Sequence, residues 1–265
     1  MDTGTAGGGA RRIALLLQYD GAGFNGWQIQ NGGRTVQAEV ERALNVFTGE
    51  CTRLVGAGRT DAGVHALGQV AHFDTACTAG LQRLCMGLNG ILERSISVKN
   101  AYHVPEGFDA RRSARSREYI YLIHNGRQRN PFAARRAMWV SQPLDAGYLN
   151  ETASHLVGEM DFAAFCKKSS ALGSTVRRIE SIEVTRAEDL VMISIKGNAF
   201  LHNMVRVIVG TMCSMHKNGD PPSRVREILE GRDRTRAGAT APAHGLYLRN
   251  VIYDPPLASM ESAFK

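Results

Sequence analysis

The sequence lacks the features of several protein classes. No apolar run reaches the roughly 18 residues that a membrane span needs, and the longest candidate, Met204 to Met215, contains Arg206. The five cysteines are scattered and never stand in C-x-x-C spacing, which argues against a disulfide scaffold or zinc knuckle and favours a reducing compartment. Residues Met1 to Ala10 are rich in Gly, Thr and Ala without an apolar core, so we expect no secretory signal.

Patterns for nucleotide and metal binding are also missing or incomplete. There is no G-x-x-x-x-G-K-[ST] motif and no H-E-x-x-H, so we expect neither a P-loop nor a metal site. Gly21 to Gly26 matches G-x-G-x-x-G, but the next helix is predicted to begin only near Thr35. A dinucleotide fold needs the helix to open within the motif. We therefore expect no nucleotide cofactor here, and interpret the segment as a turn-rich loop whose Gln28 is a candidate substrate contact.

Arginine is what the chain has in excess. Of the 32 basic residues against 25 acidic ones, six are lysine and 26 are arginine, and the net charge is +7. Because the planar guanidinium grips a phosphate at two points, an arginine-rich surface favours a polyanionic partner such as nucleic acid. The 265 residues, 43% of them hydrophobic, are enough for one large domain or for two halves that share a core.

Strand and helix patterns alternate along the chain. Predicted strands lie at 13–19, 52–55, 69–73, 96–104, 118–123, 175–185, 190–196 and 251–253, and predicted helices at 36–47, 81–92, 144–156, 200–216 and between 221 and 231. Thr35 is the expected N-cap of the first helix, and Gly49 is expected to terminate it. This mixture, with hairpins as well as crossovers, predicts an α+β fold with a largely antiparallel sheet. We expect a disordered extension (1–11), an N-terminal half (12–112), a C-terminal half (113–256) and a tail (257–265).

The segment from Gly56 to Ala66, G-A-G-R-T-D-A-G-V-H-A, is the strongest candidate for chemistry. Its glycines allow a tight turn and a close approach to a ligand, and between them stand one arginine, Arg59, and one carboxylate, Asp61. The alternative is a plain turn in which Asp61 caps its own backbone and Arg59 is solvated.

This string closely resembles the active-site loop of pseudouridine synthases, and in its form G-R-T-D-A-G-V-H-A it is similar to the tRNA pseudouridine synthase A family. The resemblance continues in family order at residues 18–28, 35–37, 108–111, 117–119, 201–211 and 245–248. The main departure is the extension before Arg12. The likeness therefore covers nearly the whole chain.

The resemblance implies a fold of two ferredoxin-like halves that form one extended, mostly antiparallel sheet, with helices on one face and a central cleft. It implies isomerisation of uridine to pseudouridine at positions 38, 39 and 40 of the tRNA anticodon stem-loop, without cofactor or metal. The family is typically a homodimer. We expect the bacterial cytoplasm, with an organelle and a trimmed transit peptide as the alternative.

Within this resemblance Asp61 is the nucleophile, and its target, uracil C6 or ribose C1′, stays open. A buried carboxylate stays ionised only beside a cation. Arg206 lies between two valines of an apolar helix, where an unpaired charge would cost several kcal/mol, so we expect a buried partner, and the resemblance makes it Asp61. The alternative is that Arg206 reaches solvent.

Tyr119 is expected to stack on the target uracil, and its hydroxyl is a candidate for removing the proton from C5; packing in the core is the alternative. Arg59 is placed to fill the space left by an everted base or to hold a flanking phosphate, unless it forms a structural ion pair. Arg111 and Arg112 begin a basic run that is the candidate phosphate-binding surface. The run contains eight arginines and one acid, namely Arg111, Arg112, Arg115, Arg117, Arg127, Arg129, Arg135 and Arg136, with Glu118. Lys167-Lys168 and Arg177-Arg178 form a second basic stretch.

Two other functions remain open. A tRNA-binding chaperone would keep the basic surface but little or no catalysis. An oxidoreductase would use Gly21 to Gly26 for a dinucleotide and would have to bind NAD(P).

Overall fold

The computed structural model describes residues 10–166 and 173–264. The expected extension up to residue 9, the Lys167-Lys168 pair and the last residue of the expected tail lie outside these ranges. Within the described part, no helix is both long and apolar enough to cross a membrane.

The first part of the described chain forms four strands and two α-helices. Its elements are β1 (Arg11–Tyr19), η1 (Gly21–Gly23), α1 (Val36–Thr48), β2 (Val55–Gly56), β3 (His65–Thr75), α2 (Leu81–Ile91) and β4 (Ile96–His103). Thr35 caps α1 by accepting a hydrogen bond from the Ala38 backbone, and Gly49 ends it in the left-handed conformation. Both cap residues were expected from the sequence, because capping depends on local side-chain chemistry.

The second part supplies the remaining strands and helices. They are β5 (Ala114–His124), β6 (Met138–Trp139), α3 (Ala146–Ser154), β7 (Gly158–Asp161), η2 (Ala163–Phe165), β8 (Val176–Ala187), β9 (Leu190–Gly197), α4 (Met204–Asn218), α5 (Arg224–Glu230), η4 (Arg234–Arg236), η5 (Ala243–Gly245), β10 (Leu246–Tyr253) and η6 (Leu257–Ser259).

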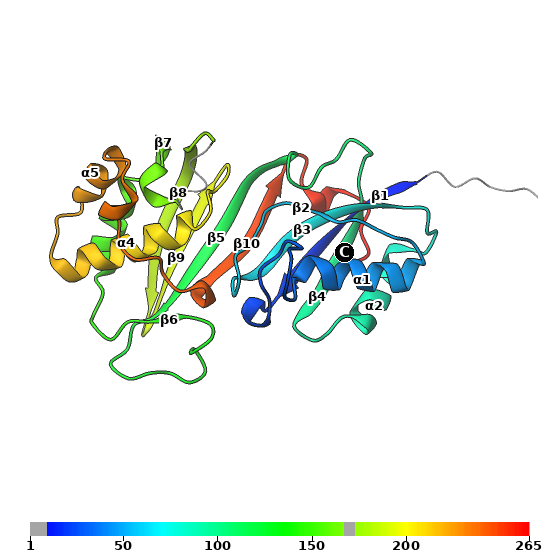
Figure 1. The fold of residues 1–265 in the computed structure, drawn as a ribbon, viewed down its shortest axis with the longest axis horizontal. Coiled ribbons are helices and arrows are strands. Elements are labelled where there is room, and N and C mark those ends of the chain that lie inside the picture. The colour runs from blue at the N-terminus through cyan, green and yellow to red at the C-terminus, as the bar shows by residue number, and fades with distance from the viewer. Residues whose placement is uncertain (1–9, 167–172, 265) are drawn as a thin grey trace, which may run out of the picture.

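All of these strands join one sheet with the order β4-β1-β3-β10-β5-β9-β8-β7, while β2 pairs with β3 and β6 with β5. The pairs are antiparallel except for β3 with β10 and β5 with β6. The last strand of the chain, β10, therefore lies at the centre and joins the two parts, and α1 and α4 lie in front of the sheet (Figure 1). The predicted α+β fold with one extended, mostly antiparallel sheet is confirmed.

Several predicted boundaries were wrong because strand pairing overrides local composition. The strand expected at 52–55 is reduced to β2, while β3 and β10 each begin at least four residues earlier than expected. His65 at the start of β3 is paired with Tyr247 in β10, so a Gly-rich stretch becomes strand. The helix expected from residue 200 begins at Met204, after Asn203 adopts a left-handed φ of 65°. The short strand β7 was missed.

Candidate active site

The segment from Gly56 to His65, here called the Asp61 loop, connects β2 to β3, and β3 is the neighbour of β10 in the sheet. Its backbone is held from both sides. Gln69 of β3 donates to the Gly58 carbonyl at 2.8 Å, and the Trp27 backbone N–H donates to the Thr60 carbonyl at 3.1 Å. The hydroxyls of Tyr19 and Thr60 also lie 2.8 Å apart. Asp61 therefore stands on a turn whose position is fixed by buried hydrogen bonds.

The glycines of the G-x-G-x-x-G match serve this packing. A Cβ on Gly26 would lie 2.5 Å from the Thr60 carbonyl oxygen, and the φ of Gly26 is +88°. A Cβ on Gly21 would lie 2.0 Å from the Val64 carbonyl oxygen. These contacts agree with the interpretation of residues 21–33 as a loop, since the close approach required of the glycines is to the Asp61 loop. Gln28, in the same loop, is exposed to solvent.

The structure brings Asp61 and Arg206 together although they are far apart in the sequence. The Arg206 Nη1 donates to Asp61 Oδ2 at 3.0 Å, and the two side chains are 17% and 26% exposed. The same guanidinium donates to Asn203 Oδ1 at 2.9 Å and, through Nε, to the Ala241 carbonyl at 2.7 Å. These three acceptors fix the orientation of the guanidinium, and the carboxylate next to it still reaches solvent.

His202 is a further neighbour of the carboxylate that the sequence reasoning did not name as a site residue. Its Nε2 lies 3.4 Å from Asp61 Oδ1, and its side chain is 46% exposed. His202 directly precedes Asn203, whose left-handed backbone stands immediately before α4. The only sequence signal was its place in the segment 201–206 beside Arg206.

Tyr119 of β5 is buried, 8% exposed, and packs edge-on against Phe200 with 5.1 Å between ring centroids. A Cβ on Gly58 would lie 3.8 Å from its hydroxyl oxygen, so the hydroxyl faces the Asp61 loop. None of the described residues hydrogen-bonds to that hydroxyl. Burial raises the pKa of Tyr119 to about 12, and nearby Arg117 lowers it and Asp61 raises it. The phenol is therefore neutral near pH 7.

Arg59 is exposed and forms no ion pair with any described side chain. Arg111 and Arg112 are also exposed, and Asp109 Oδ1 accepts hydrogen bonds from both of their backbone N–H groups at 2.8 Å. Their guanidinium groups stay free of described ion pairs at the start of β5. The three side chains are thus available to a ligand.

The basic run between 111 and 136 does not form one continuous surface. Arg117 is half-buried and donates to the backbone carbonyls of Ala57, Arg111 and Asn198, so it has a structural role. Arg136 pairs with Asp20 at 2.7 Å. The 11 residues of β5 lie between Arg111 and Arg112 on one side and Arg127, Arg129 and Arg135 on the other, which separates these two groups by roughly 35 Å at about 3.3 Å per residue.

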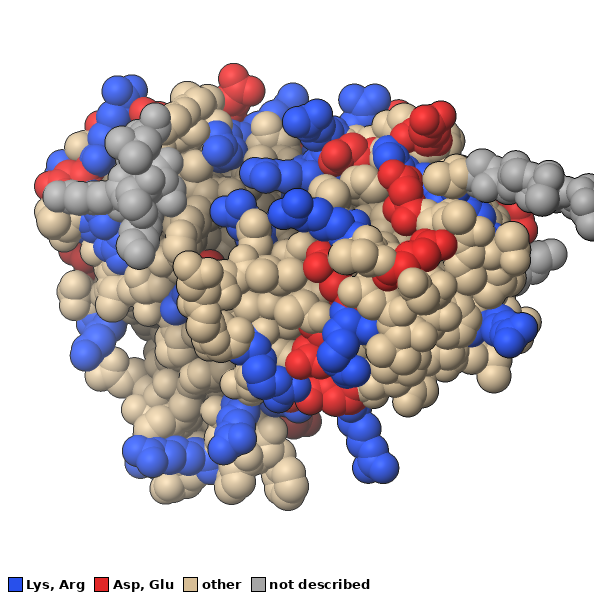
Figure 2. Space-filling view, turned by 45° about the vertical axis from the view of Figure 1, so that its right-hand side comes forward, with Lys and Arg blue, Asp and Glu red and all other residues tan. Residues whose placement is uncertain are grey.

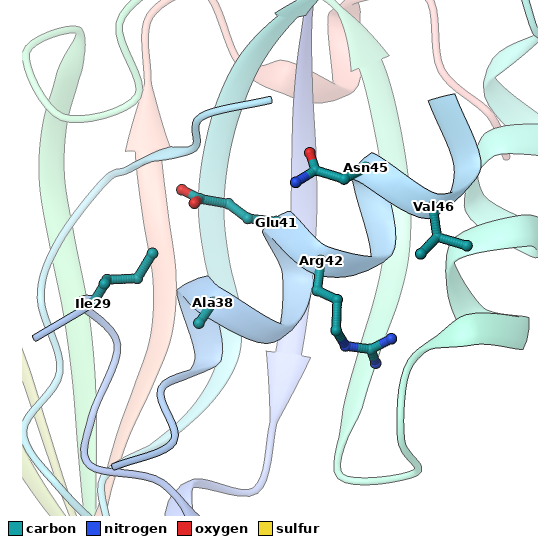
Figure 3. Close-up of a pocket in the computed structure, with 6 residues that line it drawn as sticks. All are labelled: Ile29, Ala38, Glu41, Arg42, Asn45 and Val46. Carbon is teal, nitrogen blue, oxygen red and sulfur yellow. The ribbon is translucent and has the colours of Figure 1, made fainter. Parts of the chain in front are cut away.

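Two hollows are described in this structure, and Asp61 lines neither. The first, of about 500 Å³, lies over α1 and is open to solvent (Figure 3). Its lining residues are Ile29, Ala38, Glu41, Arg42, Asn45 and Val46. The second, of about 450 Å³, includes Asp20, Glu93, Arg94 and Arg135. Among the residues that the structure describes, no group of three or more His, Cys, Asp or Glu side chains is placed to hold a metal ion.

The pair of Asp61 with Arg206, the buried Tyr119 facing the Asp61 loop and the unpaired surface arginines fit an enzyme that acts on a polyanion such as RNA. A family model described as tRNA pseudouridine synthase matches residues 16–111 and 152–254. The chain belongs to this family.

Curated relatives named tRNA pseudouridine synthase A agree with the assignment. The protein of Brachyspira hyodysenteriae is 42% identical over 243 residues, covering 91% of this chain and 98% of its own length. The protein of Herminiimonas arsenicoxydans is 44% identical over 250 residues, covering 93% of this chain and 91% of its own length. The protein of Shouchella clausii is 45% identical over 247 residues, covering 93% of this chain and 95% of its own length. A solved archaeal box H/ACA sRNP Nop10-Cbf5 complex aligns with a TM-score of only 0.35 at 13% identity, covering 76% of this chain and 42% of that chain.

Proposed function

We propose that this tRNA pseudouridine synthase isomerises uridine at positions 38, 39 and 40 of the anticodon stem-loop, with Asp61 as the nucleophile. The observation that supports it most directly is the ion pair of Asp61 with Arg206 at 3.0 Å, in a family that isomerises uridine in tRNA. A nucleophilic carboxylate must be correctly oriented and must reach the substrate. The hydrogen bond from Arg206 holds the carboxylate in place, and the 26% exposure of Asp61 leaves it accessible.

The reaction breaks the N1–C1′ bond, forms a C5–C1′ bond and releases the hydrogen of C5 as a proton, while N1 takes up a proton, so that the product is an isomer of uridine. The detached uracil must stay in the site while it turns. Tyr119 is the residue we assign to this task, because stacking of a base on an aromatic ring is worth about 1–3 kcal/mol. Its pKa of about 12 argues against a phenolate that removes the C5 proton, which was the second role suggested by the sequence.

A target uridine inside a stacked stem-loop has to be everted before it reaches Asp61. Arg59 is exposed two residues before Asp61, so we assign it to the space that the everted base leaves or to a flanking phosphate. Arg111, Arg112 and Gln28 are likewise exposed and are proposed as substrate contacts. Contacts of arginine with phosphate position an RNA without reading its sequence, which suits an enzyme that accepts three neighbouring positions.

We further propose that the enzyme acts as a homodimer in the cytoplasm. All five cysteines lie in the described residues and carry free thiols, which supports a reducing compartment. Sedimentation velocity at micromolar concentration gives the oligomeric state directly, and a monomer there would contradict the dimer.

The decisive test of the function is Asp61→Asn. The amide keeps the shape of the side chain but is neither charged nor nucleophilic, so we expect turnover to be abolished while the Kd for tRNA stays within a few-fold of wild type. Pseudouridine is mapped in an unmodified tRNA transcript after incubation with each protein. Retained turnover in the variant would overturn the role of Asp61. A wild-type protein that binds tRNA tightly without forming pseudouridine would instead favour the chaperone.

A further inference from the structure

The connection from β5 to β6, residues 126–137, projects from the molecule below the sheet (Figure 1). It contains Arg127, Arg129, Arg135 and Arg136, and no acidic residue occurs between positions 119 and 144. On the lowest part of the molecule in Figure 2, the visible charged side chains are all basic. The charged residues within this connection, here called the arginine loop, are therefore all basic.

The arginine loop is folded rather than extended. Its backbone turns through hydrogen bonds from Ala133 N to the Asn130 carbonyl at 3.1 Å and from Ala137 N to the Ala133 carbonyl at 2.9 Å. At its base, the Trp139 indole donates to the Gly126 carbonyl at 2.9 Å. Arg129 lies over the same indole, 5.0 Å from the ring centroid. The loop thus holds its tip in a defined place.

Phe132 stands at this tip and is 94% exposed. Asn130 Oδ1 accepts a hydrogen bond from its backbone N–H at 3.0 Å, which fixes the residue in the turn. Its ring contacts no ring or guanidinium among the described residues. Arg127 and Arg135 are exposed on either side of it in the sequence, and neither forms an ion pair with a described acid. An uncovered aromatic ring between unpaired arginines matches the combination of stacking and phosphate contact by which proteins hold single-stranded RNA.

We propose that the arginine loop binds the substrate tRNA, with Phe132 stacked on an unpaired base and Arg127 and Arg135 on nearby phosphates. The proposal rests on the proposed function and adds a contact region roughly a strand length away from Arg111 and Arg112. The charge of the surface selects RNA over a second copy of the chain. A symmetric dimer that joined this surface to its own copy would bring arginines against arginines.

The position of the arginine loop relative to the active site is set by a chain of direct contacts. Arg136 pairs with Asp20 at 2.7 Å, and Asp20 Oδ1 lies 2.9 Å from Nδ1 of His65, the last residue of the Asp61 loop. The Tyr247 hydroxyl donates to the Arg136 carbonyl at 2.8 Å, and its ring stacks on His65 with 4.6 Å between centroids. An RNA on the arginine loop is thereby held at a fixed place with respect to Asp61.

The test measures the Kd for an unmodified tRNA transcript over a range of KCl concentrations. Phe132→Ala should raise the Kd roughly 5- to 150-fold, the factor that corresponds to one lost stack. Phe132→Tyr keeps an aromatic ring and should bind tRNA with a Kd close to that of wild type, whereas Phe132→Leu should bind as weakly as Phe132→Ala. The double variant Arg127→Ala/Arg135→Ala should lower the slope of log Kd against log salt by about 1.4–1.8.

A matched control removes two exposed arginines from the outer helices, Arg83 of α2 and Arg226 of α5, and should leave the slope unchanged. A Phe132→Ala variant that binds tRNA within two-fold of wild type would overturn the proposal. A Phe132→Leu variant with the same Kd for tRNA as wild type would also overturn it. So would a Phe132→Ala variant that no longer forms a dimer in sedimentation but binds tRNA as wild type does. Pseudouridine formation by the wild type is measured separately, so a failure of the proposed function is distinguishable from a failure of the loop.

Discussion

Replacing Arg206 with methionine removes the cation beside Asp61 and leaves an unbranched apolar side chain in the same helix. The guanidinium now makes three hydrogen bonds, to Asp61, Asn203 and the Ala241 carbonyl. The carboxylate would keep His202, 3.4 Å away, as its one remaining basic neighbour among the described residues. We therefore expect the variant to fold and to lose most of its turnover.

The size of the effect follows from distance and exposure. At 3.0 Å and an effective dielectric constant of about 20, the attraction between unit charges is about 5 kcal/mol. Water reduces this value, because the side chains of Arg206 and Asp61 are 17% and 26% exposed. Exposed pairs are worth about 0.2–1 kcal/mol, and breaking buried pairs costs about 3–5 kcal/mol. For this intermediate case we expect a loss of about 2–3 kcal/mol, or roughly 30- to 150-fold in kcat.

The assay follows release of tritium from tRNA labelled at C5 of uridine, since C5 loses its hydrogen when it bonds to C1′. The control is Arg224→Met, which breaks a 3.5 Å pair with Asp220 in which the arginine is 50% exposed. We expect its kcat to stay within two-fold of wild type. If Arg206→Met also keeps its kcat within three-fold, the arginine does not hold the carboxylate for catalysis, and the reasoning is refuted.

Three further predictions concern the tyrosine, a glycine and two histidines. Tyr119→Phe should keep kcat within ten-fold of wild type. Tyr119→Leu removes the ring that stacks on the base, so its kcat should fall roughly 5- to 150-fold. Equal losses of kcat in the two variants would assign the role to the hydroxyl. Gly26→Ala combines a clash at 2.5 Å with a φ of +88°, so it should lower Tm by more than Gly32→Ala does. At Gly32 the φ is +82° and no atom lies within 4 Å, so we expect the alanine there to lower the free energy of unfolding by about 1–2 kcal/mol. Burial lowers the pKa values of His65 and His72. The unfolded chain then binds protons that the native state does not, so the free energy of unfolding should fall as the pH drops from about 6.5 to 5; urea unfolding at pH 7.5 and 5 that gives equal values would contradict it.

Local chemistry made part of the molecule predictable from the sequence. The N-cap at Thr35 and the C-cap at Gly49 bound α1 as expected, because each depends on residues within one turn. The expectation of a buried partner for Arg206 rested on the cost of an unpaired charge among valines. In the structure the partner is Asp61, which is only partly buried, with 26% of its side chain exposed. The choice of Asp61 over other acids came from the resemblance to a family and not from the helix pattern.

Contacts across the sheet were not predictable in this way. Nothing local shows that β10, the last strand, lies between β3 and β5, so the early start of β3 at His65 was missed. The arginines between 111 and 136 are close in sequence and were expected to form one surface. A strand of 11 residues within the run separates its two ends by the length of that strand, and Arg117 and Arg136 are used within the protein.

The way in which those two arginines are used connects the basic groups to the reacting carboxylate. Arg117 Nη2 donates at 3.0 Å to the carbonyl of Ala57, near the start of the Asp61 loop, and also to the carbonyl of Arg111. Arg136 reaches the other end of the same loop through Asp20 and His65. An RNA that contacts both groups of exposed arginines therefore rests on the elements that position Asp61. The distance from a bound phosphate to the carboxylate is then fixed by strands and ion pairs.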